Sequence, residues 1–218
     1  MDVARFRKLP IIGILRQVEL SSIEPLMEAA ISSGLETIEI TMNTKDATEL
    51  IKKAARFSGK RLMVGAGTVV DMESLKSAIR SGASFIVMPV FVSDVVKYCV
   101  KNKIPVFPGA LTPQEIYTAW NAGATMVKVF PSNFFGPAYF KEIKGPFDRI
   151  ELLACGGVTP ENIRAYLSGG ASAVAIGASV FKKEWIIKKD YPSISRRIEE
   201  YLKAMRSCEN APVASPKF

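Results

Sequence analysis

The chain has 218 residues, of which 48% are hydrophobic and 23% are charged, so its length and composition are those of a globular protein with one sizeable core. Its 29 basic and 21 acidic residues give a net charge of +8, and no apolar run reaches the ~18 residues that a membrane span requires. The absence of histidine excludes Ser-His-Asp and Cys-His nucleophile systems and His-ligated metal sites. General acid and base catalysis must therefore rely on Glu, Asp, Lys, Tyr or Cys.

The cysteines and the charge distribution indicate a compartment and exclude some partners. Cys99, Cys155 and Cys208 are odd in number and show no C-x-x-C spacing, which argues against a disulfide framework and a thiolate metal site. Residues 1–10 are charged and lack the apolar core of a secretory signal. We expect a cytoplasmic protein without membrane attachment. Part of the basic surplus lies in residues 182–189 and 203–206, which is typical of solvated helix faces, so no nucleic-acid partner is expected.

Apolar segments alternate with helix-like stretches along the chain. Each of four such segments begins with a glycine that follows an amphipathic stretch, for example residues 23–33 or 113–122. We predict that these glycines are left-handed helix caps that lead into buried strands. They recur at intervals of 41–48 residues, at Gly34, Gly82, Gly123 and Gly170.

Four further apolar segments, at 11–15, 62–66, 104–107 and 149–154, complete a set of eight predicted strands. Eight strands that alternate with helices over about 200 residues predict an α/β fold of the closed (β/α)8 type, the TIM barrel. An open doubly wound sheet is the alternative, but the same junction at every second strand favours closure, because an open sheet has edges. We expect one barrel domain over residues 1–206 and a flexible tail at 207–218, which contains two prolines.

The alternation within every second strand predicts which side chains point into the barrel. The fourth and sixth residues after each glycine are aliphatic or Met, so we expect them to face the helices and the fifth residue to face inward. Alternate strands of a barrel share interior layers. The predicted inward residues are Glu39, Val87, Lys128 and Ala175.

Glu39 and Lys128 are therefore an acid and an amine in an apolar interior, where both are costly to bury unless they pair or react. One interpretation is a structural buried ion pair. The other is that burial disfavours the charged amine, so that Lys128 attacks a ketone and forms a Schiff base while Glu39 carries protons.

Barrel enzymes place their sites at the carboxyl ends of the strands. The turns Gly156-Gly157-Val158 and Gly177-Ala178-Ser179 follow the last two strands there, and both can present backbone N–H groups to a phosphate. Ordinary tight turns are the alternative. Arg16 ends the first strand, where a guanidinium suits a substrate carboxylate, although a surface charge is equally consistent with that position.

Other candidate sites are weaker. Gly65-x-Gly67 lacks the remaining glycine and the downstream acid of a dinucleotide motif, so we predict no NAD site. Cys155 is expected to be a small buried hydrophobic residue rather than a reactive thiol. Neither a metal nor an organic cofactor is predicted.

Several of these segments resemble one enzyme family. In order from about Leu9 to Phe181, they resemble the class I aldolases of 2-keto-3-deoxy-6-phosphogluconate and of its galactonate epimer, a family that includes 4-hydroxy-2-oxoglutarate aldolase activity. The matching runs are GILR ending at Arg16, IEIT around Glu39, GAGT ending at Thr68, Pro108-Gly109, VKVFPS around Lys128, GGVTPEN from Gly156 and IGAS ending at Ser179.

The resemblance implies a role for each matching residue and a set of partners. Lys128 matches the Schiff-base lysine, Glu39 the general acid/base, and Arg16 the arginine that contacts the substrate carboxylate. It further implies a TIM barrel, commonly a homotrimer, that needs no metal and binds a phosphorylated keto acid and pyruvate. Residues that line the pyruvate pocket are matched by Thr68, Pro89 and Phe130, and the phosphate site by the turns that contain Gly156, Gly157, Gly177 and Ser179.

Two positions depart from the gluconate-type pattern. Some gluconate-type members carry Arg four residues after the catalytic Glu and Thr before the paired glycines, where this chain has Asn43 and Cys155. Asn43 is closer to the galactonate type.

Two functions other than the aldolase stay open. One is a phosphate-binding isomerase or epimerase, in which Lys128 acts as a fixed charge and Glu39 as a base, and the other is a sugar-phosphate binding protein without activity.

Overall fold

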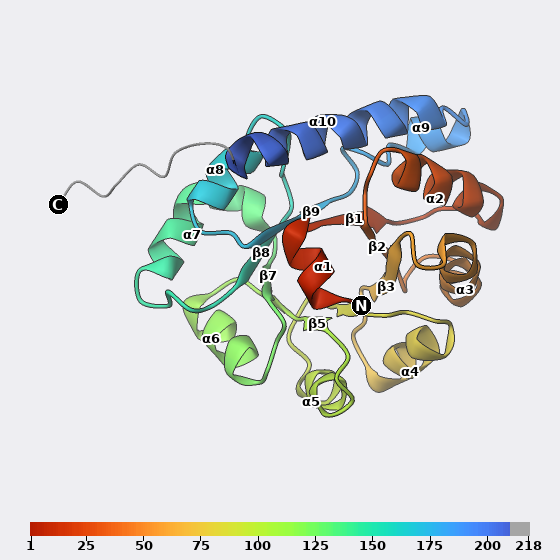
Figure 1. Ribbon diagram of the computed structural model, residues 1–218. Helices are drawn as coiled ribbons and strands as arrows, with labels where there is room; N and C mark the ends of the chain where they lie inside the picture. The colour runs from red at the N-terminus through yellow and green to blue at the C-terminus, as the bar shows by residue number, and fades with distance from the viewer. Residues whose placement is uncertain (210–218) are drawn as a thin grey trace.

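The strands of the computed structural model, which describes residues 1–209, are parallel and form one ring-shaped sheet (Figure 1). Their order is β5-β4-β3-β2-β1-β9-β8-β7-β6. The first and last strands in this order, β5 and β6, are parts of one segment divided at Pro108, which has no N–H to donate to a ladder. The ring closes through this segment, so the predicted eight-stranded barrel is confirmed. The strands are β1 (Ile11–Leu15), β2 (Thr37–Thr41), β3 (Met63–Gly67), β4 (Ile86–Val87), β5 (Val106–Phe107), β6 (Gly109–Ala110), β7 (Val127–Val129), β8 (Leu152–Cys155) and β9 (Ala173–Ile176).

Helices follow the strands and surround the ring (Figure 1). The four glycines predicted as left-handed caps have φ between 85° and 103°, which confirms that prediction. None of the helices within residues 1–209 is long and apolar enough to cross a membrane. The helices are α1 (Val3–Lys8), α2 (Ile23–Ser32), α3 (Ala47–Ser58), α4 (Met72–Arg80), α5 (Ser93–Lys101), α6 (Pro113–Asn121), α7 (Gly136–Lys144), α8 (Ile163–Ser168), α9 (Lys183–Ile187) and α10 (Tyr191–Glu209), with short 3-10 helices η1 (Leu20–Ser22) and η2 (Ser132–Phe134).

The two faces of the sheet carry separate apolar clusters, as the strand alternation predicts. Val87 and Ala175, two of the residues expected to point inward, belong to the cluster inside the ring. The cluster between strands and helices contains the residues expected to point outward, namely Ile38, Ile40, Ile86, Met88, Val127, Val129, Val174 and Ile176. The register of the strands therefore follows from burial on both faces.

Helix α1 lies across the centre of the ring, at the end where the strands begin (Figure 1). Its Phe6 is fully buried and packs edge-to-face on Phe107, with 5.7 Å between ring centroids, and Phe107 packs similarly on Phe85. Arg5 fixes the helix from outside through a 2.7 Å ion pair with Glu36. Six residues with one buried position have no apolar periodicity, so the sequence did not predict this helix.

The C-terminal helix α10 packs against α2 and α8 and closes the ring of helices (Figure 1). It runs through Glu209. Ser207, predicted to begin the flexible tail, is therefore helical, because the packed apolar face of α10 extends the helix past the expected boundary. Residues 210–218 of the predicted tail lie outside the described residues.

Candidate active site

Glu39, in the middle of β2, and Lys128, in the middle of β7, are the charged residues whose side chains enter the barrel from these strands. Both are buried, with 2% and 6% of their surfaces exposed. Burial raises the pKa of Glu39, and the charge of Lys128 partly opposes this rise, so the two groups lie close enough to interact, as the shared interior layer predicts.

The buried carboxyl of Glu39 has one oxygen atom without a hydrogen-bond partner among the described residues. Burial raises the pKa of Glu39, and the nearby charges of Lys128 and Arg16 oppose that shift. Its Oε2 atom has no hydrogen-bond partner in the structure, and the ion pairs within 4.0 Å among the described residues do not include a Glu39–Lys128 pair. The amine and the acid are thus near each other without closing into the structural ion pair that was the alternative interpretation.

Two glycines make room for the residues around this pair. A Cβ atom at Gly67 on β3 would lie 2.7 Å from the Glu39 Oε1 atom, so only glycine leaves the space that the carboxyl occupies. A Cβ at Gly109 would lie 2.1 Å from the Pro89 carbonyl oxygen, and Gly109 is paired with Lys128 across the ladder. Pro89 therefore lies against the strand next to the lysine, where the resemblance implies a pocket residue.

Thr68 follows Gly67 directly and has a left-handed backbone, with φ of 56°. That conformation is unusual for a β-branched residue and is found mostly where surrounding structure imposes it. Thr68 is half-buried at the mouth of the barrel. Thr68 therefore lies directly after Gly67, the residue of β3 that packs against the Glu39 carboxyl.

Phe130 and Cys155 border Lys128. The Lys128 Nζ atom lies 5.2 Å from the centroid of the Phe130 ring, which is 40% exposed. Cys155 is buried, as predicted; burial raises the pKa of its thiol, while a hydrogen bond and the charge of Lys128 act in the opposite direction. The amine therefore has an aromatic face on one side and a thiol on another.

Arg16 lies exposed just past β1, and its positive charge lowers the pKa of Glu39. The next residue, Gln17, has a left-handed backbone, and its N–H donates to the Thr44 hydroxyl at 3.1 Å. That hydroxyl also lies 2.9 Å from the hydroxyl of Thr41, and both threonines are buried. The two threonines thereby fix the turn that carries Arg16, and sequence reasoning missed them. The hydrogen bond between Gln17 and Thr44 joins residues 27 positions apart, so no local sequence signal reveals it.

The turn after β8 requires both of its glycines. Gly156 and Gly157 have φ of 104° and 73°, and a Cβ at Gly157 would lie 2.5 Å from the Cβ of Asn133. The Ser132 hydroxyl donates to the Gly156 carbonyl at 2.7 Å, and the Asn162 amide donates to the Gly157 carbonyl at 2.8 Å. The carbonyls of this turn are therefore occupied by side chains.

Four N–H groups in this turn and in the turn after β9 have no acceptor among the described residues. Gly177 begins the second turn, and its carbonyl accepts the N–H groups of Val180 and Phe181 at 2.9 Å each. Because β8 and β9 are paired, the two turns lie at the same end of neighbouring strands. Unpaired N–H donors at such turns suit an anion. No acceptor within residues 1–209 is found for the backbone N–H groups of Gly156, Gly157, Ala178 and Ser179.

Because the strands are parallel, the predicted site residues that follow them, from Arg16 to Ser179, lie at one end of the barrel. Asn43 lies exposed in the loop after β2. Among the described residues, no three His, Cys, Asp or Glu side chains are placed to hold a metal ion. The arrangement can form an imine, move a proton and hold anionic groups at the turns around the mouth.

Comparison with known proteins agrees with this chemistry. Residues 3–197 match the family described as KDPG and KHG aldolase. A 2-dehydro-3-deoxy-6-phosphogalactonate aldolase from Escherichia coli is 32% identical, over 91% of this chain and 98% of its own length. A 2-dehydro-3-deoxy-phosphogluconate aldolase from Pseudomonas aeruginosa is 30% identical, over 90% of this chain and 88% of its own.

Among solved structures, one described as native KDPGal superimposes with a TM-score of 0.88 at 31% identity, covering 94% of this chain and 98% of that one. The match to the family model and the similarity of these relatives extend over almost all of the barrel. The chain therefore belongs to the KDPG and KHG aldolase family and is an aldolase, a carbon–carbon lyase.

Proposed function

We propose that this protein cleaves a 2-keto-3-deoxy-6-phospho sugar acid, of the gluconate or galactonate type, into pyruvate and glyceraldehyde 3-phosphate through a Schiff base on Lys128. One observation carries this proposal: Lys128 and Glu39 share the barrel interior without an ion pair, and Glu39 Oε2 has no partner. A substrate can therefore lie between the amine and the acid.

The reaction begins at the ketone carbon C2. The uncharged Lys128 amine adds to this carbon, and the resulting carbinolamine loses water as Glu39 delivers a proton to the departing oxygen. The product is an iminium, which draws electrons from the neighbouring C3–C4 bond. Burial raises the pKa of Glu39, so this carboxyl can carry a proton at a pH where an exposed one is ionised.

Bond cleavage follows from the iminium. Glu39, now a carboxylate, accepts the proton of the C4 hydroxyl, the C3–C4 bond breaks, and its electron pair forms an enamine on C3. The C4 carbon leaves as the aldehyde of glyceraldehyde 3-phosphate. Protonation of the enamine at C3 and hydrolysis of the imine release pyruvate and restore the amine.

We assign the two ends of the substrate to two different groups of residues at the mouth of the barrel. Arg16, beside the strand that pairs with β2, binds the carboxylate of the keto acid. The unpaired N–H groups of the two glycine turns, together with Ser179, bind the phosphate. Fixing both ends orients the scissile bond between Lys128 and Glu39. Thr68, Pro89 and Phe130 line the pyruvate part of the pocket in this assignment.

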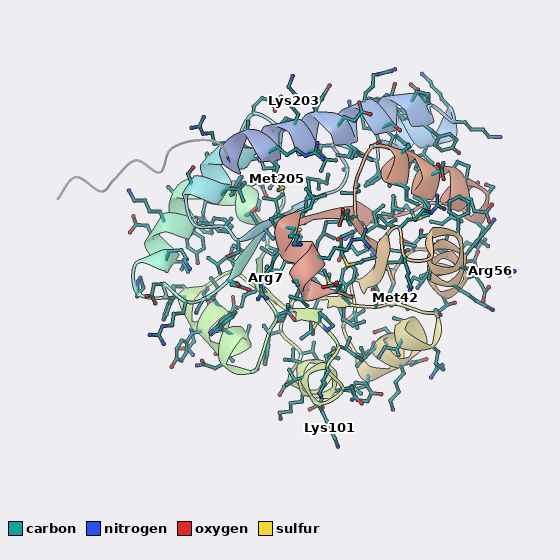
Figure 2. All side chains as sticks on the ribbon, viewed as in Figure 1. Arg7, Met42, Arg56, Lys101, Lys203 and Met205 are labelled. Atoms are coloured by element: carbon teal, nitrogen blue, oxygen red, sulfur yellow. The ribbon has the colours of Figure 1, made fainter. Side chains whose placement is uncertain are left out.

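Borohydride reduction in the presence of pyruvate tests the proposal. Reduction converts the imine into a stable secondary amine, so mass spectrometry should find one pyruvate-derived adduct per chain, on Lys128. Lys128→Met should abolish both the adduct and turnover. Lys101→Met, which changes an exposed lysine on α5 (Figure 2), is the matched control and should retain both.

An unmodified Lys128 in a protein that still binds substrate would contradict the Schiff base. Turnover of a sugar phosphate without carbon–carbon cleavage would then indicate the isomerase or epimerase alternative. Binding without any turnover would indicate the inactive binding protein.

We also propose that the protein forms a homotrimer. Apolar side chains are exposed around the end of the barrel where the strands finish: Phe134 is 77% exposed, Phe135 56% and Val90 54%. Apolar groups that gather on one face commonly mark an interface. Light scattering measures the mass in solution; a value of three chains supports the trimer, and a monomer at micromolar concentration contradicts it.

A cytoplasmic location completes the proposal. The free, buried thiols of Cys99 and Cys155 support it, because unpaired cysteines persist in reducing compartments.

A further inference from the structure

The C-terminal helix α10 packs one apolar face on the barrel. Lys203 points away from the barrel, whereas Met205 lies on the inner side of the helix (Figure 2). Among the buried residues of this helix given below, Tyr201 alone has a polar side-chain group, and Tyr201 has no exposed surface. The buried inner face consists of Ile194, Ile198, Tyr201, Leu202 and Met205.

The hydroxyl of Tyr201 bridges the two glycine turns. It donates to the Val158 carbonyl at 2.8 Å, and Val158 directly follows the glycine pair after β8. It also lies 2.8 Å from the hydroxyl of Ser179, in the turn after β9. One buried group on α10 thus joins two turns that are otherwise separate loops, each with unpaired N–H groups.

The proton of each hydroxyl can be assigned by counting donors. A carbonyl only accepts, so the single Tyr201 proton goes to Val158, and Ser179 must donate its own proton to the Tyr201 oxygen. Burial raises the pKa of Tyr201, so the phenol keeps its proton at neutral pH. Arg197 covers the phenol ring, with 5.2 Å from the guanidinium carbon to the centroid.

We infer that Tyr201 is a positioning residue that joins the two turns before phosphate binds and orients the Ser179 hydroxyl for a phosphate. This inference rests on the proposed function, which assigns the phosphate to these turns. When a phosphate oxygen accepts the hydrogen bond of the Ser179 hydroxyl, the Tyr201 hydroxyl can turn away from the Val158 carbonyl and donate to the Ser179 oxygen. Tyr201 therefore joins the two turns while they are empty and remains a hydrogen-bond partner of Ser179 when phosphate is bound.

Tyr201→Phe removes the hydroxyl and keeps the ring. For the phosphorylated substrate, KM should rise about threefold to tenfold with kcat unchanged, which is the effect of one lost hydrogen bond. For the same keto acid without its phosphate, kcat/KM should equal that of the wild type. The rate of borohydride trapping with pyruvate should also be unchanged, because Lys128 is untouched. Equal losses on both substrates, or no change on the phosphorylated one, would overturn the inference.

A control and a second variant separate this effect from damage to the fold. Tyr98→Phe alters a half-buried tyrosine on α5 and should change neither substrate's constants. In a Ser179→Ala background, Tyr201→Phe should have a smaller effect than in the wild type, because the two hydroxyls act as a pair. Fully additive effects would show that Tyr201 does not act through Ser179.

Calorimetry with inorganic phosphate tests the same inference without catalysis. The wild type should bind phosphate more tightly than Tyr201→Phe by the same factor that separates the KM values. Equal binding by both proteins would overturn the role of Tyr201 even if the wild type is an active aldolase. Failure of pyruvate trapping with a retained difference in phosphate binding would instead overturn the Schiff base and leave the bridge intact.

Discussion

The two ends of the barrel interior are built from opposite kinds of residue. At the end where the strands begin, Phe6, Phe85 and Phe107 pack edge-to-face within one apolar cluster. Toward the other end, Glu39 and Lys128 are just as deeply buried, yet Glu39 keeps an oxygen without a partner. Burial of the aromatic rings stabilises the folded state, whereas burial of the acid and the amine destabilises it through the cost of desolvating charge.

The contrast teaches that stability and chemistry are divided along the barrel axis. The aromatic end can be changed at a cost in folding free energy alone, because it contains no reacting group. The polar end can be changed at a cost in rate, with little loss or even a gain in folding free energy. Two substitutions, Glu39→Gln and Phe6→Ala, test this division in three measurements.

Glu39→Gln should have the largest effect. The amide has the shape of the acid but cannot carry a proton, so kcat should fall by about 10²–10⁴-fold. The pyruvate adduct on Lys128 should still form, although more slowly. Steady-state kinetics and borohydride trapping measure both quantities. Glu73→Gln, which alters an exposed residue on α4, is the control, and a similar loss there would contradict a specific role for Glu39.

Phe6→Ala should have the reverse pattern. Truncating a fully buried aromatic ring should lower the free energy of unfolding by about 3–5 kcal/mol, while kcat and KM of the folded enzyme stay unchanged. Urea unfolding and kinetics at a temperature where the variant is folded measure these effects. Lys8→Ala, at an exposed position of the same helix, should change neither. A loss of kcat in Phe6→Ala would show that the two ends are coupled.

The smallest effect concerns the pH dependence of stability. The pKa of Glu39 is raised in the folded state above its ordinary value of 4.5, so the folded protein holds the proton more tightly than the unfolded chain does. Its contribution to stability is therefore complete below that value and is lost as the pH rises through the raised pKa. Urea unfolding between about pH 5 and about pH 8 should show Glu39→Gln gaining stability relative to the wild type as the pH increases. A constant difference would mean that Glu39 does not titrate in this window.

Local sequence pattern was sufficient to predict the barrel and the burial of Glu39 and Lys128 inside it. The aliphatic residues on either side of Glu39 and of Lys128 indicate a strand that is buried on both faces, and such burial fixes the register of the strand. The glycines before the strands report a left-handed conformation that other residues avoid. Both signals lie within a few residues of the feature they predict.

The features that the sequence did not reveal depend on contacts between distant segments. Tyr201 meets Val158 and Ser179 across separations of 43 and 22 residues, and a tyrosine in an amphipathic helix ordinarily indicates only a packed ring. Thr44 meets Gln17 in the same way. Such hydroxyl contacts have no periodicity, so only the folded arrangement shows them.

Gly67 shows how much an absent side chain can determine. The Glu39 carboxyl occupies the volume that any Cβ on that neighbouring strand would fill. The location of the acid, and with it the opening that separates it from the amine, is thus maintained by a residue that takes no part in any reaction step. Redesign of this pocket for bulkier keto acids is therefore constrained by β3, a strand that carries neither Glu39 nor Lys128.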